Sequence, residues 1–352
     1  MIAAPSVVWT PLPPDFVHES LAVVERTILL GGGGHYVGSD TPVPPSVLEI
    51  AIADDRAQVG AFWDLPAALP SRLDAEPLPL DEVGPAMVSA AFVGGRAVAV
   101  VMIRASADFP GCLGGWLHPL GSESREYIGS ASSESDIGAN DHVGIADRVL
   151  VTSESESEEI FVIARSGKMD DVRWPGGAVT RTTWRHGHVK LPDGVRTSNT
   201  SDASISPSGR WIAVRGDLTS NMRDCVLVYE NGPGWPLTLR LDYPGFRVEA
   251  TTVTDAWLVV LESDNGVARL RWRTAIAGED HYLEIGQGPT TLDVLGDRAL
   301  VTQGARALVI DLARGVLTHN IQRGGATRLS NGKLAPGFAV FAEEGKIGVA
   351  AL

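Results

Sequence analysis

Short apolar segments that follow polar turns recur along the whole chain. Seven of them begin at Glu25, Gly95, Asp147, Gly209, Asp255, Asp297 and Gly337, and they read ERTILLG, GRAVAVV, DRVLVTS, GRWIAVR, DAWLVVL, DRALVTQ and GFAVFAE. Successive starts lie 70, 52, 62, 46, 42 and 40 residues apart. Apolar runs bounded by turn residues indicate strands, and the shortest spacings match a repeat of roughly 40 to 45 residues built from four strands. The pattern therefore predicts seven repeated all-β units, the longer ones carrying loop insertions.

The unit at 288–321 shows the repeat most clearly. Its expected strands are Thr291 to Leu295, Arg298 to Thr302, Ala307 to Asp311 and Val316 to Ile321. Gly296 and Asp297 form a tight turn between the first two, and every strand is short and apolar. This unit resembles the YVTN-type β-propeller repeat of bacterial proteins, which starts at glycine-proline, has an apolar second strand ending in threonine and ends its third strand in isoleucine-aspartate.

A second resemblance lies in the segment SISPSGRWIAV, Ser204 to Val214. It is similar to the Ser-Pro-Asp-Gly turn of WD40-like and TolB-like blades, with Ser208 where those families have aspartate. Both resemblances concern the fold and carry no activity. They imply an all-β, seven-bladed β-propeller of four-stranded antiparallel blades, in a single domain over residues 1–352. The expected blades cover 15–68, 86–130, 141–181, 202–242, 246–286, 289–322 and 326–352.

The two ends of the chain bear on how such a ring would close. The last unit has expected strands at Ala326 to Ser330, Gly337 to Ala342 and Ile347 to Leu352, which is one strand short of a blade. An unpaired apolar strand edge is a liability for a protein. The segment SVVWTPL at 6–12 has strand composition, so we expect it to join the last blade and close the ring. Six blades remain an alternative if the first or last unit is misassigned.

Composition narrows the class of protein. The chain has 352 residues, of which 44% are hydrophobic, and a formal net charge of −14. Its amino-terminal segment lacks the features of a signal peptide, and no apolar run is long enough to span a bilayer, so the cytoplasm is the expected compartment. The negative charge disfavours nucleic acid and membrane surfaces, and any charge-driven partner should be basic. Cys112 and Cys225 are too few for a disulfide framework.

An acidic stretch gives the first candidate site. From Ser153 to Glu159 the sequence reads SESESEE, between the expected second and third strands of the third blade. The resemblance implies that such loops share a face with the connections between blades, here the serine-rich segment 130–141. Residues of both loops would form a negative patch: Glu134, Asp136, Asp141, Glu154, Glu156 and Glu158. It has three interpretations, a patch that steers a basic protein, a calcium site, or a solvated hairpin tip.

Histidines give the second candidate. His186 and His188, in TWRHGHVKLPDG, lie in an expected insertion between the third and fourth blades, and they could bind a transition metal with His35 or Asp217 as a further ligand. Isolated loop histidines more often face solvent, so no cofactor is predicted, and calcium or a transition metal stays an alternative. The glycine run Gly31 to Gly34 lacks the Lys-Ser/Thr pair of a phosphate loop and reads as a flexible loop.

No enzyme motif stands out, since the sequence has no Gly-x-Ser-x-Gly elbow, no His-Glu-x-x-His and no dinucleotide fingerprint. Propeller enzymes collect acids and histidines from several blades, so a catalytic site would be sought at the channel mouth. The catalytic candidates are Asp40, Asp141, His188, Asp217 and Asp264. Trp184 and Trp235, in loop-like surroundings, are the tryptophans expected to make contacts with a partner.

Two functions follow from these observations. The first is a non-enzymatic, monomeric propeller whose acidic face holds a protein partner, as a complex subunit or an immunity-type inhibitor. The second is an enzyme, a metal-dependent lactonase-like hydrolase acting on a small molecule at the channel mouth. Charge reversal at Glu154, Glu156 and Glu158 distinguishes them, because it would abolish binding in the first case alone.

Overall fold

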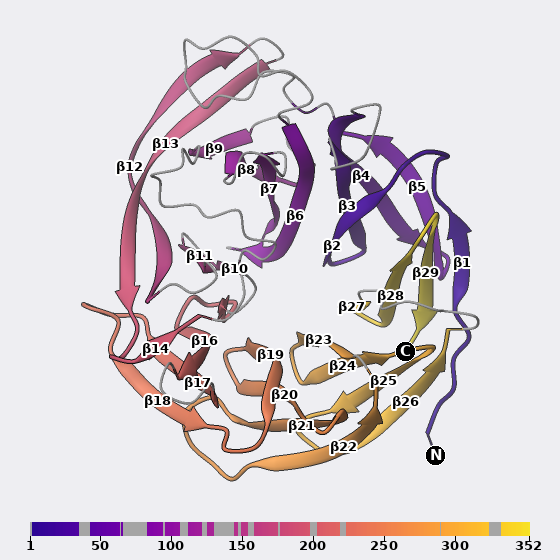
Figure 1. The fold of residues 1–352 in the computed structure, drawn as a ribbon. Helices are drawn as coiled ribbons and strands as arrows, with labels where there is room; N and C mark the ends of the chain where they lie inside the picture. Colours follow the sequence, from indigo (N-terminus) through magenta and orange to yellow (C-terminus); the bar gives the residue numbers. More distant parts are fainter. Residues whose placement is uncertain are drawn as a thin grey trace.

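Strands make up all the regular structure that the computed structural model describes. The description covers residues 2–34, 43–63, 65, 83–93, 96–105, 112–121, 125–129, 144–146, 149–153, 158–174, 177–197, 203–218, 223–288, 290–323 and 332–352. Figure 1 shows the strands grouped into sheets that stand side by side around a common centre, with β2, β6, β23 and β27 towards the middle. The all-β class expected from the apolar pattern is confirmed.

The first and last sheets bring the two ends of the chain together. The first sheet contains β2 (His18–Val24), β3 (Thr27–Gly34), β4 (Val43–Ala53) and β5 (Arg56–Phe62) in that order. The last sheet contains β27 (Gly332–Ala335), β28 (Phe338–Glu343), β29 (Lys346–Ala351) and, beside β29, the amino-terminal strand β1 (Val8–Pro11). Both sheets are antiparallel hairpin stacks.

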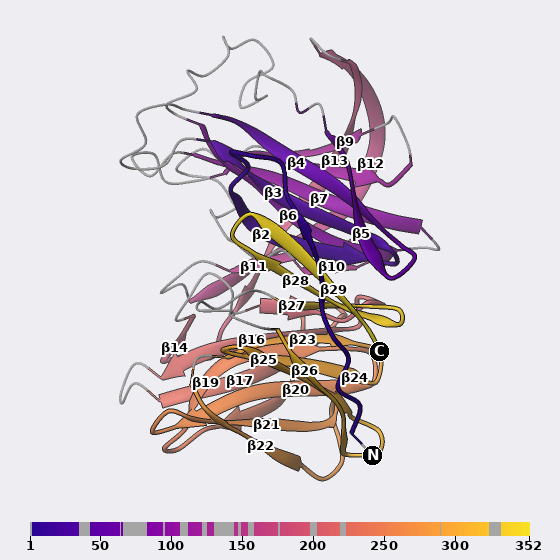
Figure 2. The same ribbon diagram turned by 90° about the vertical axis from the view of Figure 1, so that its right-hand side faces the viewer.

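The second and third groups of strands share one eight-stranded sheet, here called the double sheet. Its first group is β6 (Val83–Val93), β7 (Arg96–Ala105), β8 (Cys112–Pro119) and β9 (Arg125–Gly129). Its second group is β10 (Gly144–Ala146), β11 (Val149–Ser153), β12 (Glu159–Trp174) and β13 (Gly177–Lys190). The two groups join where Val179–Arg181 of β13 pairs in parallel with Arg125–Tyr127 of β9. This joint is possible because the long β12–β13 hairpin extends past the neighbouring strands (Figure 2).

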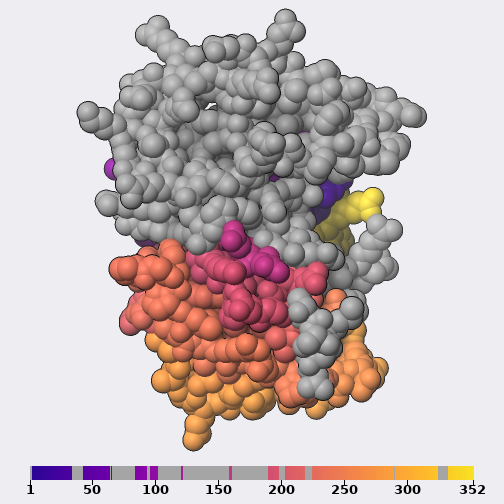
Figure 3. Space-filling view, turned by 60° about the vertical axis from the view of Figure 1, so that its left-hand side comes forward, coloured from indigo at the N-terminus to yellow at the C-terminus, as the bar shows by residue number. Residues whose placement is uncertain are grey.

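Three further sheets follow along the chain. The third sheet is β14 (Val195–Arg196), β15 (Ala203–Ile205), β16 (Trp211–Leu218), β17 (Arg223–Glu230) and β18 (Leu237–Asp242). The fourth is β19 (Arg247–Val253), β20 (Trp257–Asp264), β21 (Val267–Thr274) and β22 (His281–Gln287). The fifth is β23 (Thr290–Leu295), β24 (Arg298–Gln303), β25 (Arg306–Asp311) and β26 (Val316–Gln322). In Figure 3 the residues coloured coral and orange, which belong to these sheets, form one continuous surface.

All seven apolar segments that follow polar turns are strands. They are β3, β7, β11, β16, β20, β24 and β28. In β3 the apolar residues alternate between the two faces of a sheet that is covered on both sides, which explains the run Ile28–Leu30, all 0% exposed. The fifth sheet reproduces the four strands expected at 291–321 to within one residue at each end.

The amino-terminal segment pairs with two sheets. Val8–Pro11 pairs antiparallel with Lys346–Val349 of β29, so the strand expected from the segment 6–12 is observed. Residues further upstream continue onto β26, where the Ala3 amide donates to the Thr318 carbonyl and the Asn320 amide donates to the Ala3 carbonyl. One short segment thus covers the edges of both the fifth and last sheets (Figure 1).

The glycine run differs from its expectation. Gly31–Gly34 ends β3 and is no loop. A Cβ atom on Gly31 would lie 2.3 Å from the Ala86 carbonyl oxygen of β6, and one on Gly32 would lie 2.1 Å from the Val17 carbonyl oxygen. Glycine is therefore required by the close approach of the double sheet and of the chain entering β2, which a sequence pattern cannot show.

Other strands also end at residues that differ from the expected ones. The third strand of the third unit was expected to end at Ala164, but β12 continues to Trp174, and β13 runs to Lys190 rather than stopping near residue 181. The strand expected at 326–330 lies outside the described residues, and the first described strand of the last sheet after that segment is β27. The extra length of β12 and β13 is held by pairing between these two strands, from Glu159 with Lys190 to Trp174 with Gly177.

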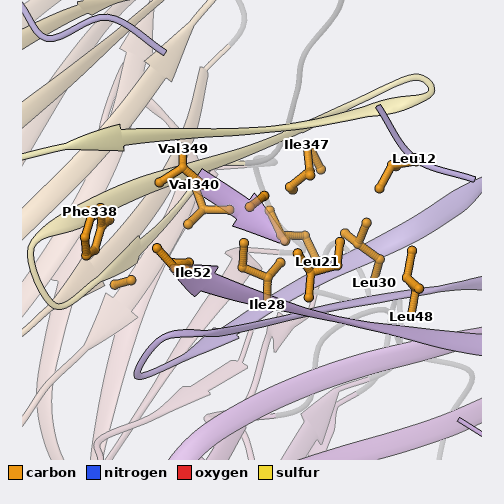
Figure 4. Close-up of a cluster of buried hydrophobic side chains, with 14 of the residues drawn as sticks. Leu12, Leu21, Ile28, Leu30, Leu48, Ile52, Phe338, Val340, Ile347 and Val349 are labelled. Atoms are coloured by element: carbon orange, nitrogen blue, oxygen red, sulfur yellow. The ribbon is translucent and has the colours of Figure 1, made fainter. Parts of the chain in front are cut away.

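Apolar side chains fill the seam between the first and last sheets (Figure 4). Leu21, Ile28 and Leu30 of the first sheet point toward Val340 and Val349 of the last sheet. Ile28, Leu30 and Val340 are 0% exposed, so the two ends of the chain are joined by a dry core.

Polar groups add a recurrent link between neighbouring sheets. The Ser20 hydroxyl on β2 accepts a hydrogen bond from the Val88 amide on β6, at 2.9 Å. The Ser204 hydroxyl on β15 likewise accepts from the Val253 amide of the fourth sheet. Asp293 on β23 accepts from the Leu334 amide of the last sheet. A side chain on one innermost strand thus satisfies the backbone of the next sheet.

Candidate functional site

The acidic stretch connects β11 to β12. Its residues 154–157, with Glu154 and Glu156, lie outside the described residues, as do Glu134, Asp136 and Asp141. Glu158 is exposed, and its carbonyl accepts a hydrogen bond from the Leu191 amide at 2.8 Å. Ser153 pairs with Ile160, so the stretch is a connection between the second and third strands of its unit, as the sequence predicts. The carboxylate of Glu158 faces solvent at the end of a fixed ladder.

The histidine segment is a strand and no insertion. His186 pairs with Ile163 and His188 with Phe161 in the β12–β13 ladder, which corrects the expected loop. The strand forms because the residues 177–190 have a long partner in β12, which ends well beyond the expected limit. Trp184, expected in a loop, pairs with Arg165 in the same ladder. The side chains of these residues, and His35 and Asp40 altogether, lie outside the described part of the chain.

Trp235 lies in the turn between β17 and β18, with a positive φ of 47°. Its side chain is half-buried and packs against a cluster that includes Ile160, Val189 and Tyr229. That cluster joins the double sheet to the third sheet. Part of the indole remains open to solvent, and contact with a partner through it stays a prediction.

Asp264 is at the tip of the β20–β21 hairpin. Asn265 and Gly266 have φ values of 49° and 80°, which is the geometry of a type I′ turn. The side-chain amide of Asn265 donates a hydrogen bond to the Asp264 carboxylate at 2.8 Å. Asp264 is exposed. The turn accounts for an aspartate at position 264, and among the described residues no other catalytic candidate lies beside it.

Asp217 has the most developed surroundings among the candidates. It lies on β16 directly opposite Asp224 of β17, and Arg215 lies two residues before it on the same strand. Arg215 Nη2 is 3.6 Å from Asp224 Oδ2, with 8% and 10% of the two side chains exposed. The Val248 amide of the fourth sheet donates to the same carboxylate. Two carboxyl groups and a guanidinium therefore meet at the seam between the third and fourth sheets.

The electrostatics of this group are set by burial. Removal from water raises the pKa of Asp224, while the Val248 amide and the Arg215 charge oppose the rise, and Asp217 adds to it through a hydrogen bond and its charge. Two carboxylates at opposite cross-strand positions repel when both are ionised, which is why the charge of Asp217 contributes to the raised pKa of Asp224. On the other face of β17 burial raises the pKa of the Cys225 thiol to about 12, so this free cysteine is an inert part of the core.

Arg215 and Asp224 were not among the residues that the sequence singled out. Their signal is visible in retrospect, because RGDLTSNMRD puts three charges at inward-facing positions of two otherwise apolar strands. The register that makes Asp217 and Asp224 opposite depends on where the hairpin turns, which the sequence leaves open.

Metal binding finds no support in the part of the chain that the structure describes, where no group of three His, Cys, Asp or Glu side chains could hold an ion. Within the same residues, no helix has the length and apolar character needed to cross a membrane.

Comparisons with known proteins extend the description of the fold. No protein-family model matches the sequence, and no curated protein matches it. Among solved structures, the chain is similar to one titled as the crystal structure of the mitotic checkpoint complex, with a TM-score of 0.57 and 10% identity over 98% of this chain and 93% of that chain.

Two other solved structures are similar over almost their whole length. The hydrazine synthase of Kuenenia stuttgartiensis matches with a TM-score of 0.57 and 11% identity, over 97% of this chain and 98% of that chain. The WD40 domain of Neurospora crassa Pan2 matches with a TM-score of 0.55 and 10% identity, over 100% of this chain and 96% of that chain. At such identities the likeness concerns the fold alone. The sheets around a common centre, hairpin order and full-length matches together give this chain a β-propeller fold similar to that of WD40 domains.

Proposed function

We propose that this chain is a non-enzymatic binding protein, a seven-bladed β-propeller whose acidic loop face holds a protein partner with a basic surface. The observation that carries the proposal is the full-length similarity to WD40 domains, with 100% of this chain matched to the domain of Pan2. Propellers of this kind present loops on a rigid frame, and loops on a rigid frame commonly carry binding residues.

The blade count rests on the double sheet. Taking β6–β9 and β10–β13 as separate blades gives seven with the other five sheets. The pairing of β1 with β29 supports a ring closed by both ends of the chain. Closed in this way, the frame would hold its loops in fixed relative positions, which reduces the entropy lost when a partner binds.

Charge favours a basic partner. The whole chain carries a net charge of −14, and the connection between β11 and β12 concentrates glutamates at one end of a strand ladder. Like charges gathered on one surface accelerate association with an opposite surface and suppress binding of acidic proteins. A complex subunit or an immunity-type inhibitor would both use such a surface, and the cytoplasm remains the predicted compartment.

The alternative, a metal-dependent lactonase-like hydrolase, has less support. The described residues contain no metal-ligand group, and the carboxyl pair of Asp217 and Asp224 lies in a seam, with Asp224 already bonded to Val248 and Arg215. The similarity to hydrazine synthase is at the level of the fold and brings no reaction with it.

The test is charge reversal on the acidic stretch. A triple variant with Glu154→Lys, Glu156→Lys and Glu158→Lys is compared with the wild type in affinity capture from the native host. The control carries the same charge change at exposed sites on other sheets, with Glu19→Lys, Glu279→Lys and Glu284→Lys. Each captured protein is then purified, and its Kd is measured as a function of salt concentration.

The proposal predicts a stoichiometric basic partner that the wild type and the control retain and the triple variant loses. Its affinity should fall as salt increases, and all three proteins should unfold at similar temperatures, because exposed loop changes cost little stability. A partner retained equally by all three proteins would contradict the acidic face as the binding surface. No partner, together with turnover of a small ester or lactone, would favour the enzyme.

A further inference from the structure

Arg323 is a buried charge at the seam between the fifth sheet and the last sheet. It follows directly after β26, and only 1% of the residue is exposed. Its amide donates to the Ala305 carbonyl at 2.8 Å, and its Nη2 donates to the Gly304 carbonyl. The guanidinium lies 5.5 Å from the centroid of the Phe341 ring on β28. Backbone and ring contacts thus fix the side chain between the two sheets.

Most of the donors on this guanidinium are unused. Among the residues that the structure describes, Nε and Nη1 of Arg323 have no hydrogen-bond partner. An arginine side chain stays protonated in proteins, so it cannot escape the cost of burial by becoming neutral. Burying a charge is expensive unless the charge is paired and hydrogen-bonded. With the groups that the structure describes, Arg323 has no carboxylate partner, and its guanidinium makes a hydrogen bond through Nη2 alone.

The charge that acts on Arg323 comes from Glu343, at the end of β28. Glu343 is committed elsewhere, because Lys346 Nζ lies 3.0 Å from its Oε2. Its other oxygen, Oε1, is buried and has no hydrogen-bond partner in the described part of the chain. Lys346 also lies 4.2 Å from the ring centroid of Trp9, on the amino-terminal strand β1. Two cations therefore share one carboxylate where the chain ends meet.

Among Arg323, Lys346 and Glu343 the cations outnumber the carboxylate, although the whole protein has a net charge of −14. Compare the seam between the third and fourth sheets, where Arg271 and Arg273 both contact Asp280, and Arg269 pairs with Glu262. There, each buried or half-buried arginine has a carboxylate within contact distance. Among the described residues Arg323 has no carboxylate within contact distance, and its Nε and Nη1 donors stay unpaired between the fifth and last sheets.

We propose that Arg323 is the anchor of a binding site for a small oxyanion, of the carboxylate or phosphate class, in the seam between the fifth and last sheets. Charge-assisted hydrogen bonds from Nε and Nη1 would satisfy the donors and neutralise the guanidinium. The ligand must be compact, because the arginine is almost fully enclosed. Since Lys346 contacts Trp9, the bound anion would also stabilise the attachment of β1 to the last sheet.

Inorganic phosphate is the probe, with acetate as the carboxylate probe. The full-length protein is unfolded thermally in a zwitterionic buffer at constant ionic strength while the probe concentration rises. A ligand that binds only the folded state raises the Tm, and saturating phosphate or acetate should raise that of the wild type by about 2 to 4 °C. Line broadening of the ³¹P resonance of phosphate gives binding independently of unfolding.

Two variants assign the response to Arg323. Arg323→Met keeps the shape and removes the charge, so it should abolish the Tm rise and the line broadening, and it should unfold at a higher temperature than the wild type in anion-free buffer. Glu343→Gln removes the competing carboxylate and should strengthen probe binding about tenfold, which is the effect of 1.4 kcal/mol. Arg240→Met is the matched control, because Arg240 is exposed and bonded to Asp242, and it should respond like the wild type.

The proposal is overturned if neither probe changes the Tm or the resonance of the wild type, or if Arg323→Met responds as the wild type does. If Arg323→Met does not fold, Glu343→Gln decides alone, since unchanged probe binding in that variant contradicts the site. A carboxylate response without a phosphate response narrows the ligand to carboxylates. The reverse narrows it to phosphates.

Discussion

Two seams between neighbouring sheets are built in opposite ways. Between the first and last sheets the described buried residues carry no charge, and Leu30, Ile50 and Val340 belong to their cluster, with Arg26 stacking on Phe338 as the charged contact across the seam. Between the third and fourth sheets, buried Arg215, Asp224 and Glu262 lie beside an apolar cluster. In the second seam Arg269 also stacks on the rings of Phe246 and Tyr282, at 4.4 and 4.5 Å.

The difference follows from what each seam must do. Apolar contact is non-directional, so it can join two segments that are far apart in the sequence without a fixed geometry between them. Ion pairs and charge-assisted hydrogen bonds are directional, and burying them brings little net stability but makes the geometry specific. We therefore expect the apolar seam to dominate global stability and the charged seam to set local geometry and pH dependence.

The largest effect should come from removing β1, the amino-terminal strand that completes the last sheet. Deletion of residues 2–11 removes β1, its pairing with β29 and the packing of Trp9. Lost hydrogen bonds and apolar burial together should cost about 5 kcal/mol of the free energy of unfolding. Urea denaturation of the deletion variant and the full chain measures this difference in the free energy of unfolding. A deletion that unfolds at the same urea concentration as the full chain would contradict the role of β1 in closing the fold.

In the apolar seam between the first and last sheets, a single cavity should reduce stability by less than the loss of β1. Leu30 is 0% exposed, and Leu30→Ala should lower the free energy of unfolding by about 3 kcal/mol through lost burial and an unfilled space. Leu295→Ala is the control, because that leucine is 44% exposed and its loss should change stability by less than about 0.5 kcal/mol. Equal effects of the two substitutions in urea denaturation would mean that the seam is not tightly packed.

The charged seam should respond to loss of an ion pair in a pH-dependent manner. Burial raises the pKa of Glu262, and Arg269 opposes that rise. Arg269→Ala leaves the buried carboxylate without this partner. The expected cost is about 2 kcal/mol near neutral pH, below the usual value for a buried pair because 33% of the Arg269 side chain is exposed.

Acid should reduce that cost, since a protonated Glu262 no longer needs a cation. Denaturation of Arg269→Ala at neutral and mildly acidic pH measures the change. Arg247→Ala, which breaks the exposed pair with Glu249, is the control and should have little effect at either pH. A deficit of Arg269→Ala that is independent of pH would show that packing of the arginine stem matters more than its charge.

The smallest effect should be a gain. The pKa of Asp224 is raised in the folded state, so its contribution to stability is present in acid and is lost as pH rises through the folded-state pKa. The carboxylate of Asp217, on the opposite strand, raises the pKa of Asp224 further and so adds to the cost of ionising Asp224 near neutral pH. Asp217→Asn should therefore stabilise the protein by about 0.5 kcal/mol near neutral pH and give no gain in acid.

Thermal unfolding across this pH range measures the gain. Asp242→Asn is the control, because Asp242 is exposed and bonded to Arg240, and it should bring no stabilisation. A loss of stability in Asp217→Asn near neutral pH would mean that Asp217 serves the fold as a carboxylate.

Particular elements show how far the sequence could go. The four strands of the fifth sheet were predictable because each is short and bounded by turn residues such as Gly296 and Gly315, both at positive φ. The burial of Arg323 against Phe341 and the opposition of Asp217 to Asp224 were not, because each depends on residues brought together across strands or sheets. The glycines at Gly31 and Gly32 suggested a loop, and they are instead required by close backbone contacts.

The sequence by itself determined the all-β class, the seven turn-and-strand repeats and the amino-terminal strand of the last sheet, because local apolar periodicity and turn residues act over a few positions. The tertiary structure alone decided the merging of β9 with β13 and the charged seam between the third and fourth sheets. These depend on register and on which faces meet, and such long-range contacts are selected by the free energy of the whole assembly of sheets rather than by any local pattern.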